Sequence, residues 1–151
     1  MLTDYQIELR CKGGIPLLSP FVEKKERVGT ISHGLQPFGY DLRLDNKFKW
    51  ITGTKSQDGV IDPFKMDDIT YDDIEADSYV IPAYNAVLGR SLEFIKMHRD
   101  LEAVCLTKST YARLGLIAHT TGIEPGWEGF LTIELANLSP FPIRVHAFAG
   151  I

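Results

Sequence analysis

The sequence predicts an all-β fold, a sandwich or barrel with short helices. After residue 14 the apolar residues recur with a period of two, in short runs rich in β-branched and aromatic side chains. Gly, Pro, Asn and Asp separate these runs, and no helical pattern alternates with them. The 151 residues are expected to form one domain, residues 1–151, around a single core.

The first expected element is a helix. In "MLTDYQIELRCKGG" Thr3 is placed as the N-cap, and Gln6 is its capping-box partner three residues later. Gly13 and Gly14 follow, and glycine commonly ends a helix. We therefore expect one helix between Thr3 and Gly13.

Short strands account for most of the remaining chain. We expect them at residues 40–44, 47–51, 78–81, 86–94, 101–106, 115–123, 129–136 and 142–148. The acidic stretch "DPFKMDDITYDDIEAD", residues 62–77, breaks the pattern and is predicted to be a solvated loop. A metal site among its carboxylates is the alternative.

Composition narrows the possible partners and the compartment. The formal net charge is -4, which disfavours a general nucleic-acid or anionic-membrane surface, because either needs an excess of Lys and Arg. The start lacks the pattern of a signal peptide, and no apolar run reaches the roughly 18 residues of a membrane span. Cys11 and Cys105 are far apart, which favours two reduced thiols over a disulfide or a cysteine-rich zinc site. We expect a cytoplasmic protein.

The segment "LTKSTYARLGL" concentrates cations and hydroxyls. Ser109 or Thr110 is expected to cap a single helical turn, with Arg113 one turn after Ser109 and Gly115 as the stop. Backbone N–H groups at such a helix start attract phosphate. An ordinary capped surface turn is the alternative. A P-loop is excluded, because no glycine-rich loop precedes the segment and position 102 is Glu.

The segment "HTTGIEPGWEGFLTIELAN" predicts a pocket or a subunit interface. Alternation places Phe130, Thr132, Glu134 and Ala136 on one face of the strand, opposite a Leu-Ile-Leu core face. Phe, Thr and Ala are poor choices for a solvated face, although a solvent-facing Glu134 is the simpler alternative. Burial in a pocket favours a carboxylate that works as a general base.

Several motifs in a fixed order carry a family resemblance. "TKSTYARLGL" followed by "HTTGIEPGWEGFLTIELANLSPFPIRVHAFAGI" resembles the signature region of dCTP deaminases, the trimeric relatives of dUTPases. Upstream, "LLSPFV", "SHGLQPFGYDLRL", "VIDP", "IPAYNAVLGRSLEF" and "RDLEAVCL" are also similar to elements of that family. The resemblance runs over nearly the whole chain and implies a dUTPase-like fold, of the distorted-barrel or jelly-roll type, in a homotrimer with sites between subunits.

The resemblance also implies roles for particular residues. Glu134 corresponds to the family's general acid and base, and Ser109 and Arg113 to the residues that shape the reacting centre. The implied substrate-binding set is Lys108, Ser109, Thr110, Tyr111, Ala112, Arg113, Thr120, Gly122, Glu124, Trp127, Thr132, Ile133 and Glu134. Within it, the cations and hydroxyls bind the triphosphate, Glu124 helps to hold the nucleotide, and the backbone of Thr132 and Ile133 contacts the base. Gly122 stands where the family often has Ala or Pro.

The implied reaction is deamination of dCTP to dUTP and ammonia, in pyrimidine deoxynucleotide metabolism. Zinc deaminases need an H-x-E element and a P-C-x-x-C, and neither is present, so we expect a zinc-independent reaction with Mg²⁺ on the phosphates only. His119 is expected to be a structural or interface residue. The alternatives are a bifunctional enzyme that also cleaves dUTP to dUMP and pyrophosphate, and a catalytically silent nucleotide-binding regulatory protein.

One departure from the family concerns the C-terminus. The sequence ends at "HAFAGI", where family members continue with a further strand and a tail that folds over the nucleotide. We therefore expect a missing C-terminal strand and tail. Either the sequence is a truncated form, or the protein relies on a partner subunit to close its site.

Overall fold

The computed structural model describes residues 1–151, and strands dominate it. The expected helix is present as α1 (Asp4–Lys12), with Gly13 as its C-cap. The capping box is complete: Thr3 Oγ1 accepts from the Gln6 N–H at 3.4 Å, and the Thr3 N–H donates to Gln6 Oε1 at 3.0 Å. Its inner face buries Ile7 and Cys11 against the core.

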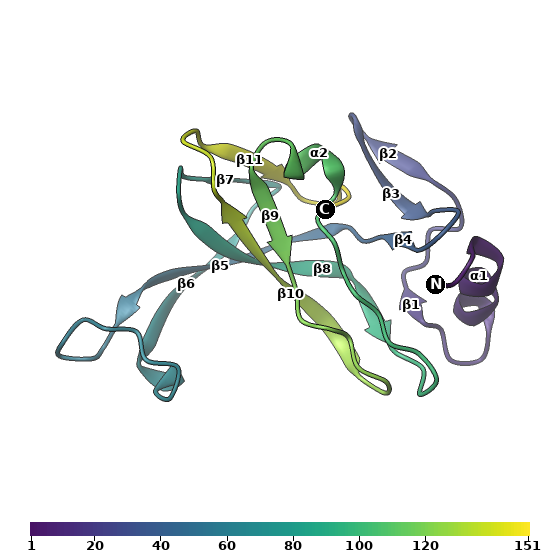
Figure 1. The fold of residues 1–151 in the computed structure, drawn as a ribbon, viewed down its shortest axis with the longest axis horizontal. Helices are drawn as coiled ribbons and strands as arrows, with labels where there is room; N and C mark the ends of the chain where they lie inside the picture. Colours follow the sequence, from purple (N-terminus) through teal and green to yellow (C-terminus); the bar gives the residue numbers. More distant parts are fainter.

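Antiparallel strands form three sheets (Figure 1). The large sheet has the order β6 (Ile69–Glu75), β5 (Leu44–Thr54), β8 (Ala86–Lys96), β10 (Glu128–Asn137) and β9 (Leu116–His119), with β1 (Leu18–Ser19) also paired to β8. A ribbon joins β7 (Ser78–Ile81) to β11 (Ile143–His146), and the third sheet joins β2 (Glu26–Val28), β3 (Ile31–Leu35) and β4 (Tyr40–Asp41). Two short helices, η1 (Met66–Asp68) and α2 (Ser109–Ala112), complete the fold. The predicted all-β class with short helices is confirmed.

Two of the segment predictions are wrong. The acidic stretch 62–77 is not all loop, because its second half is β6, paired with β5 from Lys47 opposite Glu75 to Thr54 opposite Ile69. This strand lies at the sheet edge with most residues partly or fully exposed, so acidic side chains fit on it and no apolar alternation marks it. Residues 101–106 form no strand and make one isolated bridge, between Ala103 and Ile123. The short strands β1, β2 and β3 were not predicted.

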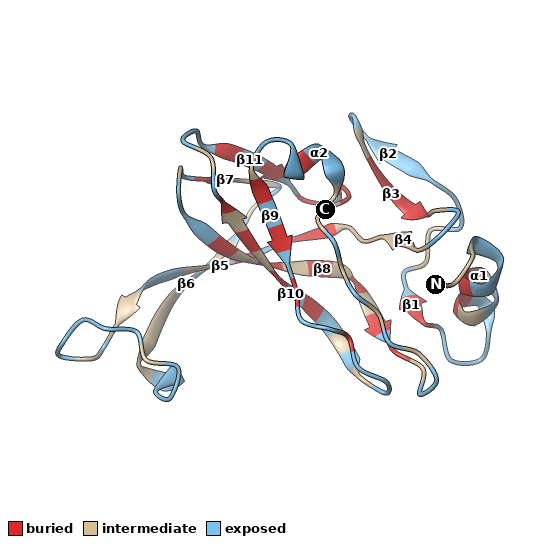
Figure 2. Ribbon diagram, in the orientation of Figure 1, coloured by how far each residue is buried: buried red, intermediate tan, exposed pale blue.

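The core lies between the large sheet and the β7–β11 ribbon. Leu131, Ile133 and Leu135 of β10 point into it, together with Leu44 of β5 and Val145 of β11. Figure 2 shows the buried residues along the central strands and the ribbon, with the outer part of the β5–β6 hairpin exposed. No helix combines the length and the apolar character that a membrane crossing requires.

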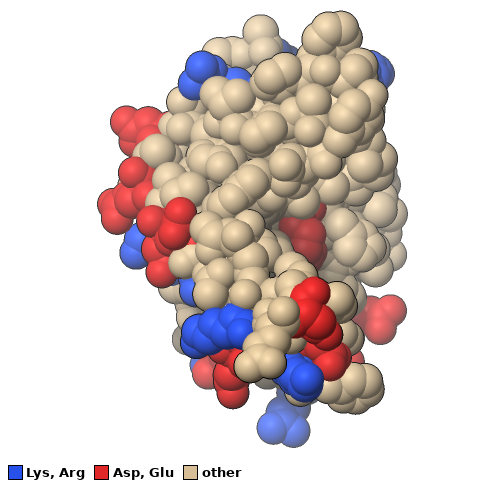
Figure 3. Space-filling view, turned by 90° about the vertical axis from the view of Figure 1, so that its left-hand side faces the viewer, with Lys and Arg blue, Asp and Glu red and all other residues tan.

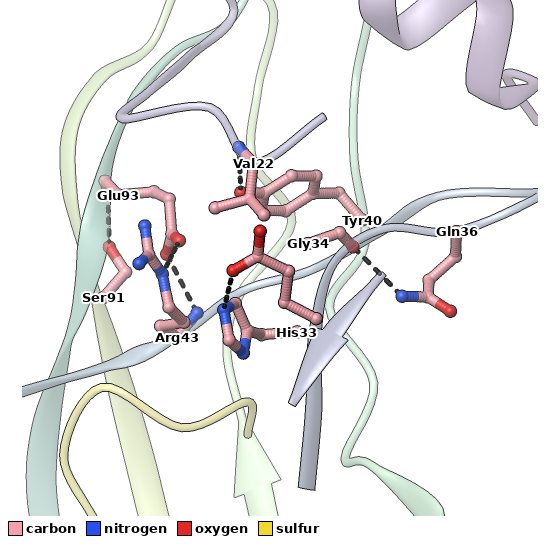
Figure 4. A network of polar contacts seen from close by, with 9 residues as sticks. Val22, His33, Gly34, Gln36, Tyr40, Arg43, Ser91 and Glu93 are labelled. Carbon is pink, nitrogen blue, oxygen red and sulfur yellow. Dashed lines mark hydrogen bonds and ion pairs between the residues drawn. The ribbon is translucent and has the colours of Figure 1, made fainter. Parts of the chain in front are cut away.

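An ion pair joins Arg43, the residue before β5, to Glu93 of β8 (Figure 4). Arg43 Nε donates to Glu93 Oε1 at 2.7 Å, and the Arg43 backbone N–H donates to Glu93 Oε2 at 2.9 Å. The Glu93 side chain is completely buried, and Ser91 Oγ donates to the Glu93 carbonyl at 2.8 Å. Nearby, the Tyr40 hydroxyl accepts from the Val22 N–H, and burial raises the pKa of Tyr40 to about 12.

The Asn137 side chain is fully buried and donates from Nδ2 to the carbonyls of Ile81, Pro82 and Phe141 at 3.1, 2.9 and 2.8 Å. The outer part of the β5–β6 hairpin, residues 50–72, extends away from the body, and we call it the arm (Figure 1).

Candidate functional site

A pocket of about 190 Å³ lies between the turn that follows β9 and the outer face of β10. It is lined by Thr121, Gly122, Ile123, Trp127, Phe130, Leu131, Thr132 and Glu134. Water fills roughly 30 Å³ per molecule, so the space equals about six waters. This volume is enough for one six-membered ring and too small for a whole nucleoside triphosphate.

Glu134 is the acidic residue of this pocket. It lies on the outer face of β10 with Phe130 and Thr132, while Leu131, Ile133 and Leu135 are buried, so the predicted alternation is confirmed. Its Oε2 atom is buried and has no hydrogen-bond partner. Buried polar atoms in proteins are nearly always paired, so this oxygen is free to accept a proton or a hydrogen bond from a ligand.

Trp127 is positioned by a tight turn. Its N–H donates to the Glu124 carbonyl at 3.1 Å, and Gly126 has a φ of +83°, a conformation that glycine adopts without strain. The Trp127 ring lies against Gly129, where a Cβ would come within 3.2 Å of it. Two backbone hydrogen bonds with Met97 fix the turn to the end of β8. Glu124 itself is exposed and does not line the pocket.

The helix α2 carries the predicted phosphate-binding residues. Its N-cap is Lys108 and no side chain caps it, so the prediction that Ser109 or Thr110 is the N-cap is wrong: the helix starts one residue earlier and includes both hydroxyls. The predicted stop is confirmed, because Gly115 has a φ of +84°. Ser109, Thr110, Ala112 and Arg113 are exposed.

The side chains of Lys108 and Tyr111, in the same segment, both make contacts within their own chain. The Lys108 ammonium forms an ion pair with Asp41, and its side chain is 14% exposed. Tyr111 is buried in the core, and this burial raises the pKa of its hydroxyl. Its side chain is therefore part of the packing in this chain.

The structure brings some of the expected site residues together and separates others. Gly122, Trp127, Thr132 and Glu134 share the pocket, and Ile133 lies behind it in the core. Thr120 is buried beside this region. None of the α2 residues lines the pocket of the same chain.

Phe130 lines the pocket, as expected from its place with Glu134 on the outer face of β10. Three further lining residues, Thr121, Ile123 and Leu131, lie outside the predicted site. Thr121 and Ile123 flank Gly122, which belongs to the predicted site. Leu131 is a buried core residue, so the alternation along β10 does not predict that it also borders the pocket.

Beside α2 the surface is apolar. The exposed side chains Tyr84, Leu114, Ile117, Leu138 and Phe141 belong to adjoining segments, and we call them the apolar end. The segments are joined by backbone hydrogen bonds from Leu138 to Gly115 and from Asn137 to Asn85, at 2.9 and 2.8 Å. Figure 3 shows that the upper part of one side of the molecule is almost free of charge, while charged residues gather lower down. Apolar patches of this kind mark interaction surfaces.

No three His, Cys, Asp or Glu side chains come together in an arrangement that could hold a metal ion. The carboxylates of residues 62–77 accordingly form no such cluster. Asp58 and Asp62 instead accept hydrogen bonds from the backbone of their own loop.

Comparisons with known proteins agree on one family. The family model described as dCTP deaminase-like matches residues 20–151. The dCTP deaminase of Anaplasma phagocytophilum is 44% identical over 151 residues, which is 99% of this chain and 80% of that protein. The dCTP deaminase of Acidobacterium capsulatum is 43% identical over 135 residues, covering 89% of this chain and 73% of the relative.

A solved structure has a similar fold. It is the 2'-deoxycytidine 5'-triphosphate deaminase of Agrobacterium tumefaciens, with a TM-score of 0.65 and 21% identity. The similarity covers 97% of this chain and 44% of that one, so this chain spans less than half of that protein's length.

Proposed function

Because the chain belongs to the dCTP deaminase-like family, we propose that it catalyses the hydrolytic deamination of dCTP to dUTP and ammonia. One structural observation carries the proposal. A carboxylate oxygen of Glu134 is buried without a partner in a pocket that is sized for a pyrimidine ring.

Glu134 acts as both base and acid in the proposed mechanism. It takes a proton from a water molecule that adds to C4 of cytosine, which gives a tetrahedral intermediate. It then delivers a proton to the exocyclic nitrogen, the C4–N bond breaks and ammonia leaves. The backbone of Thr132 and Ile133 holds the base, and one dCTP and one water give one dUTP and one ammonia.

Ser109 and Arg113 reach this centre, in our proposal, from a second copy of the chain. They are exposed, and they do not line the pocket of their own chain. The adjoining apolar end offers a surface that a second copy can cover. In a homotrimer with three contacts of this kind, the α2 helix of each subunit would lie next to Glu134 of a neighbouring subunit. There the two side chains stabilise the intermediate as hydrogen-bond donors.

The triphosphate lies outside the pocket, near α2. The Lys108 ammonium and the exposed Thr110 hydroxyl suit its negative charge, and Glu124 lies on the turn that leads to the base. Mg²⁺ in nucleotide sites is commonly bound through the substrate's phosphates, and in our proposal the ion binds there. No step in the proposed deamination passes through the ion.

We place the protein in the cytoplasm, where dUTP enters deoxynucleotide metabolism. Cys11 and Cys105 are both free thiols, which suits a reducing compartment.

The test is incubation of the purified chain with dCTP and Mg²⁺, with chromatography of the nucleotides and an ammonia assay. We expect dUTP and ammonia in equal amounts, unaffected by a zinc-selective chelator. Release of dUMP and pyrophosphate indicates the bifunctional alternative. Binding of dCTP without any product indicates a regulatory protein and contradicts the proposal.

A further inference from the structure

Phe130 has an unusual setting for a half-exposed aromatic residue. It lines the pocket with Glu134 and is 42% exposed. Phe94, directly opposite on β8, meets it edge to face with ring centroids 5.3 Å apart. The guanidinium carbon of Arg90 lies 4.3 Å from the centre of the Phe130 ring. The ring is therefore supported on two sides while it borders the pocket.

Arg90 is itself fixed in place. Its Nε donates to Asp45 Oδ2 at 2.9 Å, and a second guanidinium N–H donates to the same oxygen. The Asp45 side chain is 7% exposed, and its other oxygen accepts from the Asn46 N–H at 2.8 Å. Two N–H groups on one nearly buried carboxylate restrict the orientation of the guanidinium.

A β-bulge places Arg90 beside Phe130. Phe130 pairs with Phe94, but Thr132 pairs with Arg90, so three residues of β8 face the single residue Leu131. The Leu131 N–H, which loses its strand partner there, donates to Ser91 Oγ at 2.8 Å. Ser91 is completely buried. Bulges beside functional sites commonly redirect a side chain, and this one moves Arg90 along the strand toward the ring.

From these contacts we propose that Phe130 is the wall on which the pyrimidine ring of the nucleotide stacks, and that Arg90 is the positioning residue that holds this wall. The inference rests on the proposed function, since it needs a pyrimidine in the pocket. An aromatic ring already held by a cation and a second ring loses little conformational freedom when a base stacks on it.

Titration calorimetry with dCTP and with dCMP tests the inference without requiring turnover. Base stacking on one aromatic residue contributes roughly a tenfold to hundredfold gain in affinity. We expect Phe130→Ala and Phe130→Leu to lower the affinity for both nucleotides by that factor. The affinity of Phe130→Tyr should stay within about threefold of the wild type. Phe64→Ala is the control, because Phe64 is 96% exposed on the arm, and it should bind like the wild type.

Arg90→Gln distinguishes support of the wall from contact with phosphate. We expect it to weaken dCTP and dCMP equally, and to raise KM while kcat changes little. A loss confined to dCTP means that Arg90 binds the triphosphate and overturns its assigned role. Unchanged affinity in a folded Phe130→Leu variant overturns the stacking wall. If the wild-type chain binds dCTP but forms no dUTP, the proposed function is contradicted and the stacking proposal is not.

Discussion

Lys108 is a single residue with two possible partners. In the free chain its ammonium pairs with Asp41, whose Oδ2 also accepts from Ser32 Oγ at 3.3 Å. In the proposed function, the second partner is the triphosphate, which offers more negative charge than one carboxylate. Asp41 would then hold the Lys108 side chain near the proposed phosphate site.

Lys108→Ala is expected to weaken dCTP binding by roughly tenfold or more, because a charge-assisted hydrogen bond is lost. Asp41→Asn is the matched variant, and it should leave the affinity unchanged or raise it, since it frees Lys108. Calorimetry on both variants checks this. Equal affinity of Lys108→Ala and the wild type would remove Lys108 from the phosphate site.

Glu134→Gln keeps the shape of the side chain and removes its ability to take a proton. We expect deamination to fall by roughly a hundredfold to ten-thousandfold, while dCTP affinity stays within a few fold. Steady-state rates of dUTP formation and calorimetry measure the two effects separately. Turnover that survives the change would assign the proton transfer to another group.

The two cysteines should be slow to react. Burial raises the pKa of Cys11 to about 11 and also raises the pKa of Cys105. At pH 8 both are protonated, and the thiolate is the reactive form. Iodoacetamide at pH 8, followed by mass spectrometry, should label neither thiol quickly in the folded chain and both in urea. For Cys11, the labelling rate should rise as the pH approaches its raised pKa. Fast labelling of the native chain would contradict this prediction.

For single residues, the sequence predicted which face of a strand a side chain occupies, but it did not predict contacts between residues far apart in the chain. Glu134 could be placed on the outer face because alternation holds through β10. The contact between Arg90 and Phe130 could not, because it depends on a bulge that shifts one strand against the other. Neither the ion pair of Lys108 with Asp41 nor that of Arg43 with Glu93 has a local signature, since each joins residues far apart in the chain.

Among the elements, the arm differs most from its prediction. The body of β5 pairs with β8, but the arm is a hairpin whose two strands pair only with each other. Alternation marks a strand only where one face is buried, so the exposed β6 resembled a loop. Residues 101–106 were predicted to be a strand and are not one. Their apolar residues alternate, but the segment makes only one isolated bridge to its neighbour and no continuous strand pairing.

Shortening the arm should leave the body folded. Residues 55–68 can be replaced by Asn-Gly, which forms a two-residue turn between the paired Thr54 and Ile69. We expect the thermal midpoint to move by no more than a few degrees, because these residues bury little surface. Asn137→Ala, which removes four side-chain hydrogen bonds of a buried residue, should lower the thermal midpoint by more than the shortened arm does. Circular dichroism melts compare the two, and loss of cooperative unfolding in the shortened chain would show that the arm stabilises the body.

The whole molecule has its proposed catalytic groups on two separate surfaces. The pocket with Glu134 is on the outer face of the large sheet, and Ser109 and Arg113 lie beside the apolar end. Periodicity predicted the all-β class because most strands have one buried face. It could not show that the two surfaces are separate in one chain, since that depends on how α2 packs against β9.

Mixing two inactive variants tests whether neighbouring subunits share the site. In trimers assembled at random from equal amounts of Glu134→Gln and Arg113→Ala chains, about a quarter of shared sites carry both native residues. We expect about a quarter of wild-type activity after co-refolding, and trimer mass by light scattering. If each site is built within one chain, the mixture stays inactive. Each variant refolded alone is the control.

The buried Asn137 has a consequence for how the protein can be produced. Asn137-Leu138-Ser139 is an acceptor sequence for N-linked glycans, yet its amide nitrogen already bonds three carbonyls inside the protein. A sugar added to that nitrogen during synthesis in a secretory host would occupy the space between the segment after β7 and the turn after β10. Such chains could not reach the native packing, so intact material should come from a host compartment that lacks oligosaccharyl transfer.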